Sequence, residues 1–285
     1  MNSRDAHKRI LITGARGFTG RALSVFLQSQ GETNLTLVDR CVDAVDGVSV
    51  CDLSDQSPVA SLVSEVQPQE IYHLVGSFTQ DFNIDFETNV LSTKYLCDAL
   101  VTTQSSARLL LVGSAAEYGA VAASDNPIVE DQPLRPTSVY GLTKSFQSTL
   151  MQYYSRVHHV DLVMARTFNV YGQGISPLLF AGKMYEQIAA GGRMIEVDDV
   201  SAVRDFLHIS DVVRYYHLIM QQGVAGEVYN VGSGIPLNGA EILSKIAEEL
   251  GKDPSDFTAV SAGSTAVVKQ LFAEVGKLHT LELKE

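Results

Sequence analysis

Three side chains in the middle of the chain could together move a proton. Tyr140 precedes Lys144 by four residues in Ser138-Val-Tyr-Gly-Leu-Thr-Lys144, and Ser114 lies 26 residues before Tyr140 at the end of an apolar run. If residues 138–158 form a helix, the phenol and the ammonium lie on one face of it. A positive charge within about 4–6 Å favours the phenolate, so we expect Tyr140 to exchange a proton near neutral pH.

A glycine-rich turn near the N-terminus could hold a dinucleotide. Residues 9–13 are typical of a short buried strand, and Gly14-Ala-Arg-Gly17-Phe-Thr-Gly20 follows it before a predicted helix. Gly14 allows a tight turn, Gly17 lets the backbone approach a pyrophosphate, and Gly20 permits close packing of the helix. The N–H groups at the start of that helix would bind phosphate. The spacing G-x-x-G-x-x-G differs from the commoner G-x-G-x-x-G.

Charged residues near the next strand would contact the cofactor's ribose. The strand predicted over residues 34–38 is followed by Asp39, 19 residues after Gly20, where a carboxylate can bind a ribose 2′-hydroxyl. Asp39 therefore favours NAD. Arg40 and Arg16 could instead accept the 2′-phosphate of NADP, so the sequence leaves the choice between the two cofactors open.

The composition is that of a globular protein. The chain has 285 residues, of which 45% are hydrophobic and 19% charged, enough to bury a large core. A net charge of −12 argues against a nucleic-acid-binding surface. No apolar run approaches the roughly 18 residues of a membrane span, and the first nine residues lack the apolar stretch of a secretory signal. We therefore expect a cytoplasmic protein that does not bind membranes.

The cysteines and histidines do not indicate a metal site. Cys41, Cys51 and Cys97 are odd in number and lack metal-ligand spacing, so we expect reduced structural thiols. We expect His208 to order a turn from strand to helix, and His158-His159 to end a helix.

Strand and helix patterns alternate through the first two-thirds of the chain. Strands are predicted near 9–13, 34–38, 47–51, 70–75, 107–113 and 160–166, and helices near 18–30, 55–66, 84–103 and 138–158. This rhythm predicts an α/β fold with a Rossmann-type doubly wound parallel sheet. Ligands bind such sheets at the carboxyl ends of the strands, which is where Gly14, Asp39, Gly76 and Ser114 fall.

The remaining third predicts a smaller C-terminal substrate-binding region. We expect a dinucleotide-binding domain over residues 1–168, to which the chain returns around 202–232. Residues 169–201 and 233–285 would form the substrate-binding region beside it.

Together these motifs resemble the extended short-chain dehydrogenase/reductases, of the NAD-dependent epimerase/dehydratase type, over nearly the whole chain. The segments that carry the resemblance are 13–20, 52–53, 87–90, 113–119, 140–144, 166–172, 204–211 and 227–234. The family acts mainly on nucleotide-diphosphate sugars. The resemblance implies a nucleotide-diphosphate sugar as substrate, NADP or NAD as cofactor, and a homodimer.

The resemblance also implies roles for individual residues. Ser114 and Tyr140 would hold the reacting oxygen of the sugar, while Lys144 binds the nicotinamide ribose. Asn169 would contact the sugar nucleotide and Arg204 its diphosphate, and Asp52 would meet adenine. The predicted cofactor-binding residues are Gly14, Arg16, Gly17, Phe18, Gly20, Asp39, Arg40, Asp52, Leu53, Gly76, Asn89, Tyr140 and Lys144.

The residues beside Ser114 exclude two of the reactions that the family catalyses. Sugar-nucleotide 4,6-dehydratases place an extra acid and base just after the serine or threonine, and this chain has Ala115 and Ala116 there. Glu117 comes next, but we expect it to point elsewhere. Fucose-synthase-type enzymes use a cysteine near this loop and a later histidine, where this chain has Ala116 and Gln173-Gly174. A 4-keto reductase or a 4-epimerase remains.

The local sequence favours the reductase. Residues 113–119, 133–136 and 203–206 look most like GDP-4-dehydro-6-deoxy-D-mannose reductases, so we expect reduction of a 4-keto 6-deoxy sugar with Tyr140 as proton donor. A 4-epimerase with tightly bound NAD is the first alternative. A non-catalytic dinucleotide-binding sensor is the second, although such proteins typically lose the tyrosine or the lysine. The sequence given ends at Glu285, soon after a segment resembling the family's penultimate helix, and we expect this to affect recognition of the base and the sugar.

Overall fold

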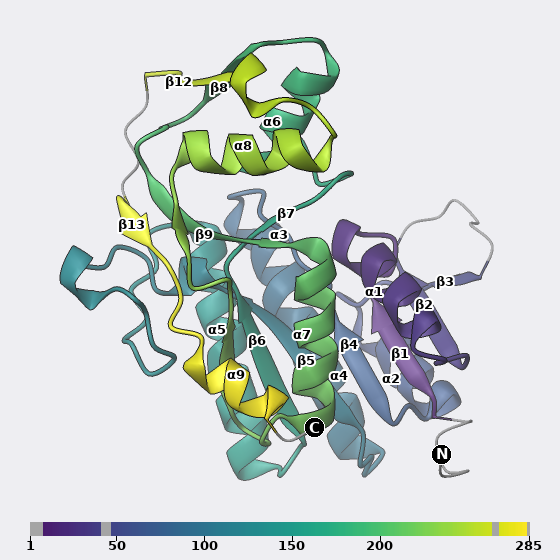
Figure 1. Cartoon of the computed structure of the whole chain (residues 1–285). Coiled ribbons are helices and arrows are strands. Elements are labelled where there is room, and N and C mark those ends of the chain that lie inside the picture. Colours follow the sequence, from purple (N-terminus) through teal and green to yellow (C-terminus); the bar gives the residue numbers. More distant parts are fainter. Residues whose placement is uncertain (1–7, 41–46, 264–267, 284–285) are drawn as a thin grey trace.

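The main sheet has seven parallel strands in the order β10-β6-β5-β4-β1-β2-β3. The computed structural model describes residues 8–40, 47–263 and 268–283 (Figure 1). The strands are β1 (Ile10–Thr13), β2 (Leu35–Asp39), β3 (Val48–Val50), β4 (Glu70–His73), β5 (Arg108–Ser114), β6 (Leu162–Thr167) and β10 (Val228–Val231). β1, β4 and β6 are buried throughout, which explains why their sequences do not alternate between apolar and polar residues.

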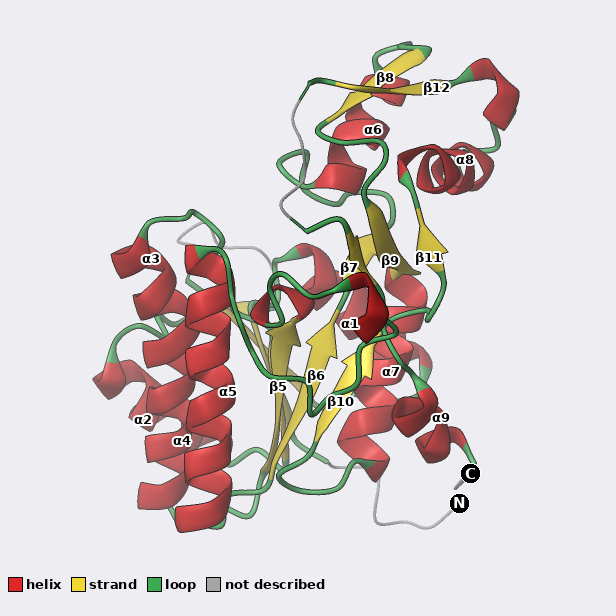
Figure 2. Ribbon diagram, turned by 90° about the vertical axis from the view of Figure 1, so that its left-hand side faces the viewer, coloured by secondary structure: helices red, strands yellow, loops and turns green. Residues whose placement is uncertain are grey.

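Helices cover both faces of this sheet, as Figure 2 shows. One face packs against α2 (Gln56–Val66), α4 (Ser92–Thr102) and α5 (Val139–Val157). The other packs against α1 (Phe18–Ser29), α7 (Ile209–Gln222) and α9 (Gly276–Glu282). The predicted doubly wound α/β fold is therefore confirmed.

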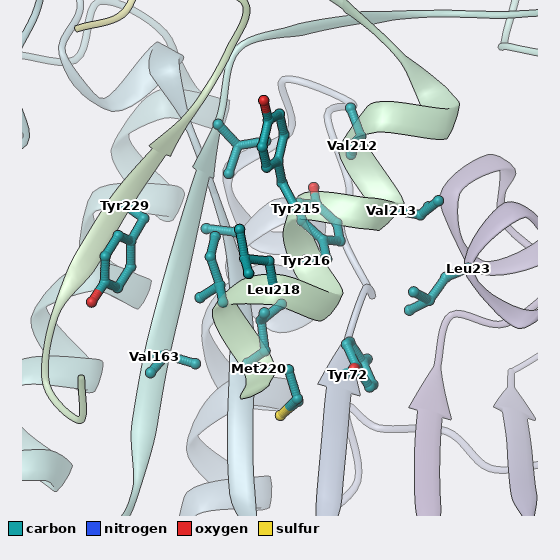
Figure 3. Packing of buried hydrophobic residues seen from close by; sticks show 14 of the residues in the cluster. Leu23, Tyr72, Val163, Val212, Val213, Tyr215, Tyr216, Leu218, Met220 and Tyr229 are labelled. Carbon is teal, nitrogen blue, oxygen red and sulfur yellow. The ribbon is translucent and has the colours of Figure 1, made fainter. Parts of the chain in front are cut away.

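The face under α7 contains an unusually aromatic core (Figure 3). Tyr72 and Tyr229 from the sheet lie in one cluster with Tyr215 and Tyr216 from α7, and Leu23 joins them from α1. Tyrosine hydroxyls in this core have hydrogen-bond partners. The Tyr216 hydroxyl shares a hydrogen bond of 2.7 Å with the Thr167 hydroxyl, and the Tyr72 hydroxyl lies 3.2 Å from a ring nitrogen of His217.

A second region lies beyond the carboxyl ends of the main strands (Figure 1). It contains β7 (Asn169–Tyr171), α6 (Phe180–Ala189), β8 (Met194–Val197), β9 (Val203–His208), β11 (Pro236–Leu237), α8 (Gly239–Glu249), β12 (Thr258–Ser261) and β13 (Gln270–Leu271). β9 pairs with β7, β11 and β13, while β8 pairs with β12. Ile195, Phe206 and Ile242 lie in its separate core. The chain enters this region after β6, returns to the main sheet through α7 and β10, leaves again, and comes back to the main sheet at α9.

The helix predicted over 84–103 is divided in the structure. Asp81 caps the short helix α3 (Phe82–Phe86) by accepting hydrogen bonds from the amides of Asn83 and Ile84. A π-helical turn, η1 (Glu87–Leu91), then leads into α4. Short 3-10 turns lie at η2 (Ala115–Glu117), η3 (Ala123–Asp125) and η4 (Pro254–Asp256).

Other predictions concern single residues. His208 caps α7 and accepts from the amide of Ser210, and α5 ends at His158, as predicted. Cys51 and Cys97 are buried free thiols, whereas Cys41 lies outside the described residues.

No helix within the described ranges is both long and apolar enough to cross a membrane. Within the same ranges, no three His, Cys, Asp or Glu side chains gather as metal ligands would.

Candidate active site

A cleft of about 980 Å³ opens at the carboxyl ends of the main strands. Seven of the predicted cofactor-binding residues line it: Gly14, Gly17, Asp39, Arg40, Asp52, Leu53 and Gly76. Its lining also includes the apolar side chains of Phe78, Ile84 and the exposed Leu178. A cleft of this size, at the carboxyl ends of the strands of a doubly wound sheet, suits a dinucleotide.

The backbone of the turn between β1 and α1 requires glycine at two positions. Gly14 has φ +70°, a conformation that glycine adopts without strain. A Cβ on Gly20 would lie 2.3 Å from the carbonyl oxygen of Gly14, so only glycine allows this contact between helix and turn. Gly17 caps α1 without a side-chain hydrogen bond, which leaves backbone amides there for a phosphate.

Two carboxylates lie at the β2 and β3 end of this cleft. Asp39 accepts hydrogen bonds from the amides of Arg16, at 3.0 Å, and Arg40, at 2.8 Å. Asp52 accepts from the hydroxyl and the amide of Ser54, and these bonds lower the pKa of Asp52, with a smaller contribution from Arg40. Among the described residues that line this end of the cleft, Asp39 and Asp52 are acidic and Arg40 is basic.

Phe18 does not line the cleft. It borders a different groove, between α1 and α7, together with Val25 and Ile209. Position 18 belongs to the glycine motif, but one residue after Gly17 the helix has already turned the side chain toward α7.

Asn89 acts on the loop that follows β4. It lies fully buried in the π-helical turn, where its side chain accepts from the amide of Ser77 and donates to the Ser77 carbonyl, both at 2.8 Å. It also donates to Thr143 on α5. These two bonds to the backbone of Ser77 hold the loop in place beside Gly76. A Cβ on Gly76 would lie 3.5 Å from Lys144 Nζ.

A smaller cavity of about 270 Å³ adjoins the start of α5. Ser114, Tyr140, Asn169 and Arg204, which the sequence places far apart, all line it. The remaining lining residues are Ala115, Ala116, Gly119, Thr137, Ser138, Thr167, Phe168, Val268 and Leu271. The structure therefore brings the predicted substrate-binding residues together around one space.

Ser114 is positioned as a hydrogen-bond donor. Its hydroxyl oxygen accepts from the amide of Ala116 at 3.2 Å, and its own amide donates to Glu117 Oε1 at 2.7 Å. These bonds form a capping box on the 3-10 turn η2. The hydroxyl keeps its own hydrogen to donate, and its hydrogen bond with Tyr140 directs it toward the phenol that lines the cavity.

The pKa of Tyr140 departs from our prediction. Burial raises it above the usual tyrosine value, and a hydrogen bond with Ser114 only partly opposes that effect, while Glu117 and Asp85 add to it. We expected Lys144 to lower this pKa, which is wrong for the protein alone, because burial of the phenol raises it. Tyr140 is therefore held in its protonated form.

Lys144 lies one helical turn after Tyr140 and is almost fully buried. Its ammonium donates to the carbonyl of Val112 at 2.9 Å and to Gln147 Oε1 at 3.2 Å. Burial lowers the pKa of Lys144 to about 8, with Glu117 acting in the opposite direction. Gln147 in turn donates to Thr93 on α4, so the lysine is held from two sides.

Arg204 and Asn169 border the cavity from the second region. Asn169 donates to the carbonyl of Asp205 at 3.0 Å, and the Arg204 guanidinium donates to the carbonyls of Val203 and Val268. Burial lowers the pKa of Arg204, and Asp199 opposes this. Arg204 is half-buried at the cavity wall with guanidinium N–H groups in excess of these two bonds.

Sequence reasoning missed several residues that shape the site. Asp85 is fully buried and accepts from Ser77 and from the amide and hydroxyl of Thr79, which fixes the loop after β4. That loop carries Phe78, whose ring meets the Tyr140 ring edge-on at 6.5 Å. Residues 76–81 lie between the predicted strand near 70–75 and the predicted helix near 84–103, and no sequence pattern showed that they fold back onto α5.

Comparison with known proteins places this geometry in a family. Residues 10–232 match the model of the NAD dependent epimerase/dehydratase family. GDP-6-deoxy-D-mannose reductase of Pseudomonas aeruginosa is 28% identical over 265 residues, covering 87% of this chain and 84% of the reductase. A dTDP-glucose 4,6-dehydratase of Streptomyces griseus is also 28% identical, covering 86% of this chain and 79% of that enzyme.

A solved structure agrees with the sequence match. RMD of Pseudomonas aeruginosa, in complex with NADPH, superposes with a TM-score of 0.80 and 25% identity, covering 96% of this chain and 91% of that one. The family model spans most of the chain, and these relatives are a reductase and a dehydratase of sugar nucleotides. The chain belongs to the NAD-dependent epimerase/dehydratase family of extended short-chain dehydrogenase/reductase enzymes.

Proposed function

We propose that the protein reduces the 4-keto group of a nucleotide-diphosphate 6-deoxy sugar, with GDP-4-dehydro-6-deoxymannose as the leading substrate and NAD(H) or NADP(H) as cofactor. Tyr140 donates the proton. The similarity to the GDP-6-deoxy-D-mannose reductase of Pseudomonas aeruginosa supports this choice of sugar.

The lining of the smaller cavity carries the proposal. Of its described lining residues, only Tyr140 and Arg204 have side chains that titrate, and a guanidinium keeps its proton. Ala115 and Ala116 stand beside Ser114 with methyl groups, and Glu117 is fully buried outside the lining. Elimination of water needs a further acid and base, whereas reduction of a carbonyl needs one proton donor.

The chain's own groups supply the proton and its positioning. When bound in the larger cleft, the dinucleotide supplies the hydride. The Ser114 hydroxyl donates to the sugar oxygen, and the raised pKa of Tyr140 keeps a proton on the phenol ready to transfer to that oxygen. Lys144 then faces the phenolate that remains and stabilises it electrostatically.

We propose that Arg204 binds the diphosphate and Asn169 the sugar nucleotide. A guanidinium can donate two parallel hydrogen bonds to phosphate oxygens, which suits a half-buried position. Residues 169–201 and 233–285 would then serve as the substrate-binding region, and residues 1–168 with 202–232 as the dinucleotide-binding domain. For the cofactor, Asp39 and Asp52 disfavour an additional 2′-phosphate, which supports NAD(H) over NADP(H).

Turnover tests the proposal. The protein is incubated with NADH or NADPH and GDP-4-dehydro-6-deoxymannose, and the loss of nicotinamide absorbance is followed. Tyr140→Phe should lower kcat at least about 100-fold with nearly unchanged cofactor affinity, because only the proton donor is lost. Tyr95→Phe is the matched control, since Tyr95 lies on α4 and lines neither cavity. A fully active Tyr140→Phe variant would refute the mechanism.

A 4-epimerase is the second candidate, because a single tyrosine beside a dinucleotide cleft also suits oxidation and re-reduction at one carbon. Conversion of a 4-hydroxy sugar nucleotide to its epimer without added reductant would select this activity over the reductase.

We also propose a homodimer. Tyr153 and Val157 lie on α5 with 50% and 56% of their surfaces exposed, which suits helix pairing between subunits. The mass of the protein in solution tests it, and a monomer at micromolar concentration would exclude it.

A further inference from the structure

A buried ion pair lies directly beneath the smaller cavity. Glu117 Oε2 is 3.1 Å from a terminal nitrogen of Arg166, and their side chains are 0% and 3% exposed. Arg166 Nε donates to the same oxygen at 3.2 Å. Such a pair contributes little to stability, because desolvation of both charges offsets their attraction. A role other than stability would explain why it is buried here.

The Glu117 carboxylate connects the two elements that carry the predicted catalytic residues. One oxygen accepts from the Ser114 amide at 2.7 Å, at the end of β5. The other accepts from the hydroxyl of Ser148 on α5. Ser148 lies four residues after Lys144 and eight after Tyr140, so the three share one face of the helix.

Two glycines make this contact between β5 and α5 possible. A Cβ on Gly113 would lie 2.7 Å from Glu117 Oε1, inside the space the carboxylate occupies. A Cβ on Gly141, the residue after Tyr140, would lie 2.4 Å from the carbonyl oxygen of Ala116. The turn η2 is therefore in direct contact with the first turn of α5.

Arg166 anchors the carboxylate to the rest of the sheet. It lies on β6 and also donates to the hydroxyl of Tyr118 at 3.0 Å and to the carbonyl of Glu130 at 3.3 Å. Tyr118 donates onward to Asn230 on β10 at 2.6 Å. The carboxylate is thus held in place by a hydrogen-bonded network that reaches three strands.

We propose that Glu117 is a positioning residue that fixes the separation between the Ser114 hydroxyl and the Tyr140 phenol. It is not a proton donor, since it neither lines the cavity nor has exposed surface. It acts by holding the Ser114 amide and Ser148 on opposite oxygens of one carboxylate. The inference rests on the proposed function only for its kinetic readout.

The test compares two double variants that both remove the ion pair. In E117Q/R166M the amide oxygen of glutamine can still accept from Ser114, and its nitrogen can donate to Ser148. In E117M/R166M no acceptor remains for the Ser114 amide, which must shift to find another partner. Neither variant leaves an unpaired buried arginine, which single Glu117 variants would.

We expect kcat to be about 10- to 100-fold lower in E117M/R166M than in E117Q/R166M, with the same dissociation constant for the dinucleotide, because small misplacements of reacting groups have effects of this size. Equal kcat values in the two folded double variants would overturn the proposal.

The pKa of Tyr140 gives a second readout that needs no substrate. Arg166 is replaced alike in both variants. Glu117, Asp85 on α3 and Tyr216 on α7 interact electrostatically with Tyr140, and Lys144 lies four residues after it on α5; of these groups, only Glu117 is replaced. Both double variants lack that charge, so their difference reports the hydrogen bond between Ser114 and Tyr140. We expect a higher pKa in E117M/R166M, measured as tyrosinate absorbance against the same protein carrying Tyr140→Phe.

The kinetic and pKa measurements distinguish a failure of the proposed reductase function from a failure of the positioning role of Glu117. If the wild type does not turn over the 4-keto sugar, the proposed function fails and the difference in pKa alone decides the positioning role. An identical pKa in both variants would then overturn it. Should E117M/R166M not fold, Ser148→Ala replaces it, with Ser145→Ala as the control on the same helix, because the Ser145 hydroxyl donates to the carbonyl of Leu142 within that helix. We expect kcat to fall about tenfold, or the pKa of Tyr140 to change, in Ser148→Ala but not in Ser145→Ala. If the two variants have the same kcat and the same Tyr140 pKa, the proposal is overturned.

Discussion

Replacing His73 should remove a measurable part of the protein's acid sensitivity. His73 ends β4 with no exposed surface, and its ring nitrogens lie 2.8 Å from Thr13 Oγ1 and 3.1 Å from Ser92 Oγ. Ser92 donates its own hydrogen to the carbonyl of Thr88, so Nε2 of His73 donates to Ser92 and Nδ1 accepts from Thr13. A second proton on the ring would face the Thr13 hydroxyl hydrogen.

The structure sets the size of this effect. Burial lowers the pKa of His73 to about 3, and the Lys144 ammonium adds to the shift. In the unfolded chain the group titrates near pH 6.5, so below that pH the unfolded state binds a proton that the folded state does not. Stability from His73 is therefore complete above about pH 6.5 and is lost as the pH falls toward about 3. Between pH 7 and pH 5 the loss is about 2 kcal/mol of unfolding free energy.

Urea unfolding of the wild type and His73→Gln at both pH values measures this difference. Carboxylates titrate in both proteins and cancel, so we expect the wild type to lose about 2 kcal/mol more than the variant on going from pH 7 to pH 5. His158→Gln, which alters an exposed histidine at the end of α5, should behave as the wild type. Parallel losses in the wild type and His73→Gln would refute the reasoning, because His73 would then titrate alike in both states.

Two further substitutions test the geometry of the clefts. Gly141→Ala should lower the free energy of unfolding by about 1–3 kcal/mol in urea, because its Cβ would lie 2.4 Å from the Ala116 carbonyl oxygen; a gain in stability, as helix propensity alone predicts, would contradict this contact. Asp39→Asn keeps an acceptor for the Arg16 amide but removes the charge, so the ratio of NADPH to NADH affinity should rise about tenfold, measured by fluorescence titration. An unchanged ratio would show that Asp39 does not face the 2′ position.

The elements around the site could be predicted because their signals are local. The spacing of Tyr140 and Lys144 on a helix, and of Gly14, Gly17 and Gly20 in a turn, depends on residues close in the sequence. The same holds for Ser114 at a strand end. Neighbouring parallel strands then bring such ends together by the topology of the fold.

The rest could not be predicted, because it depends on contacts between distant segments. Glu117 was correctly excluded from the cavity, but its partners Ser148 and Arg166 lie 31 and 49 residues away in the chain. The pKa of Tyr140 was predicted from one neighbour, whereas burial by several elements decides it. Asn89 and Asp85 fix a loop that no periodicity describes.

The position of β10 has a consequence for how the protein is made. β10 is the outermost strand beside β6, yet it follows β6 by about 60 residues, which form the first part of the second region and then α7. Until residue 231 emerges from the ribosome, the buried apolar strand β6 has an open edge, which is the kind of surface that pairs with other chains. A fragment ending near residue 168 would keep that edge permanently. Although most of the nucleotide cleft is formed by residues before 168, those residues need β10 to cover their open sheet edge.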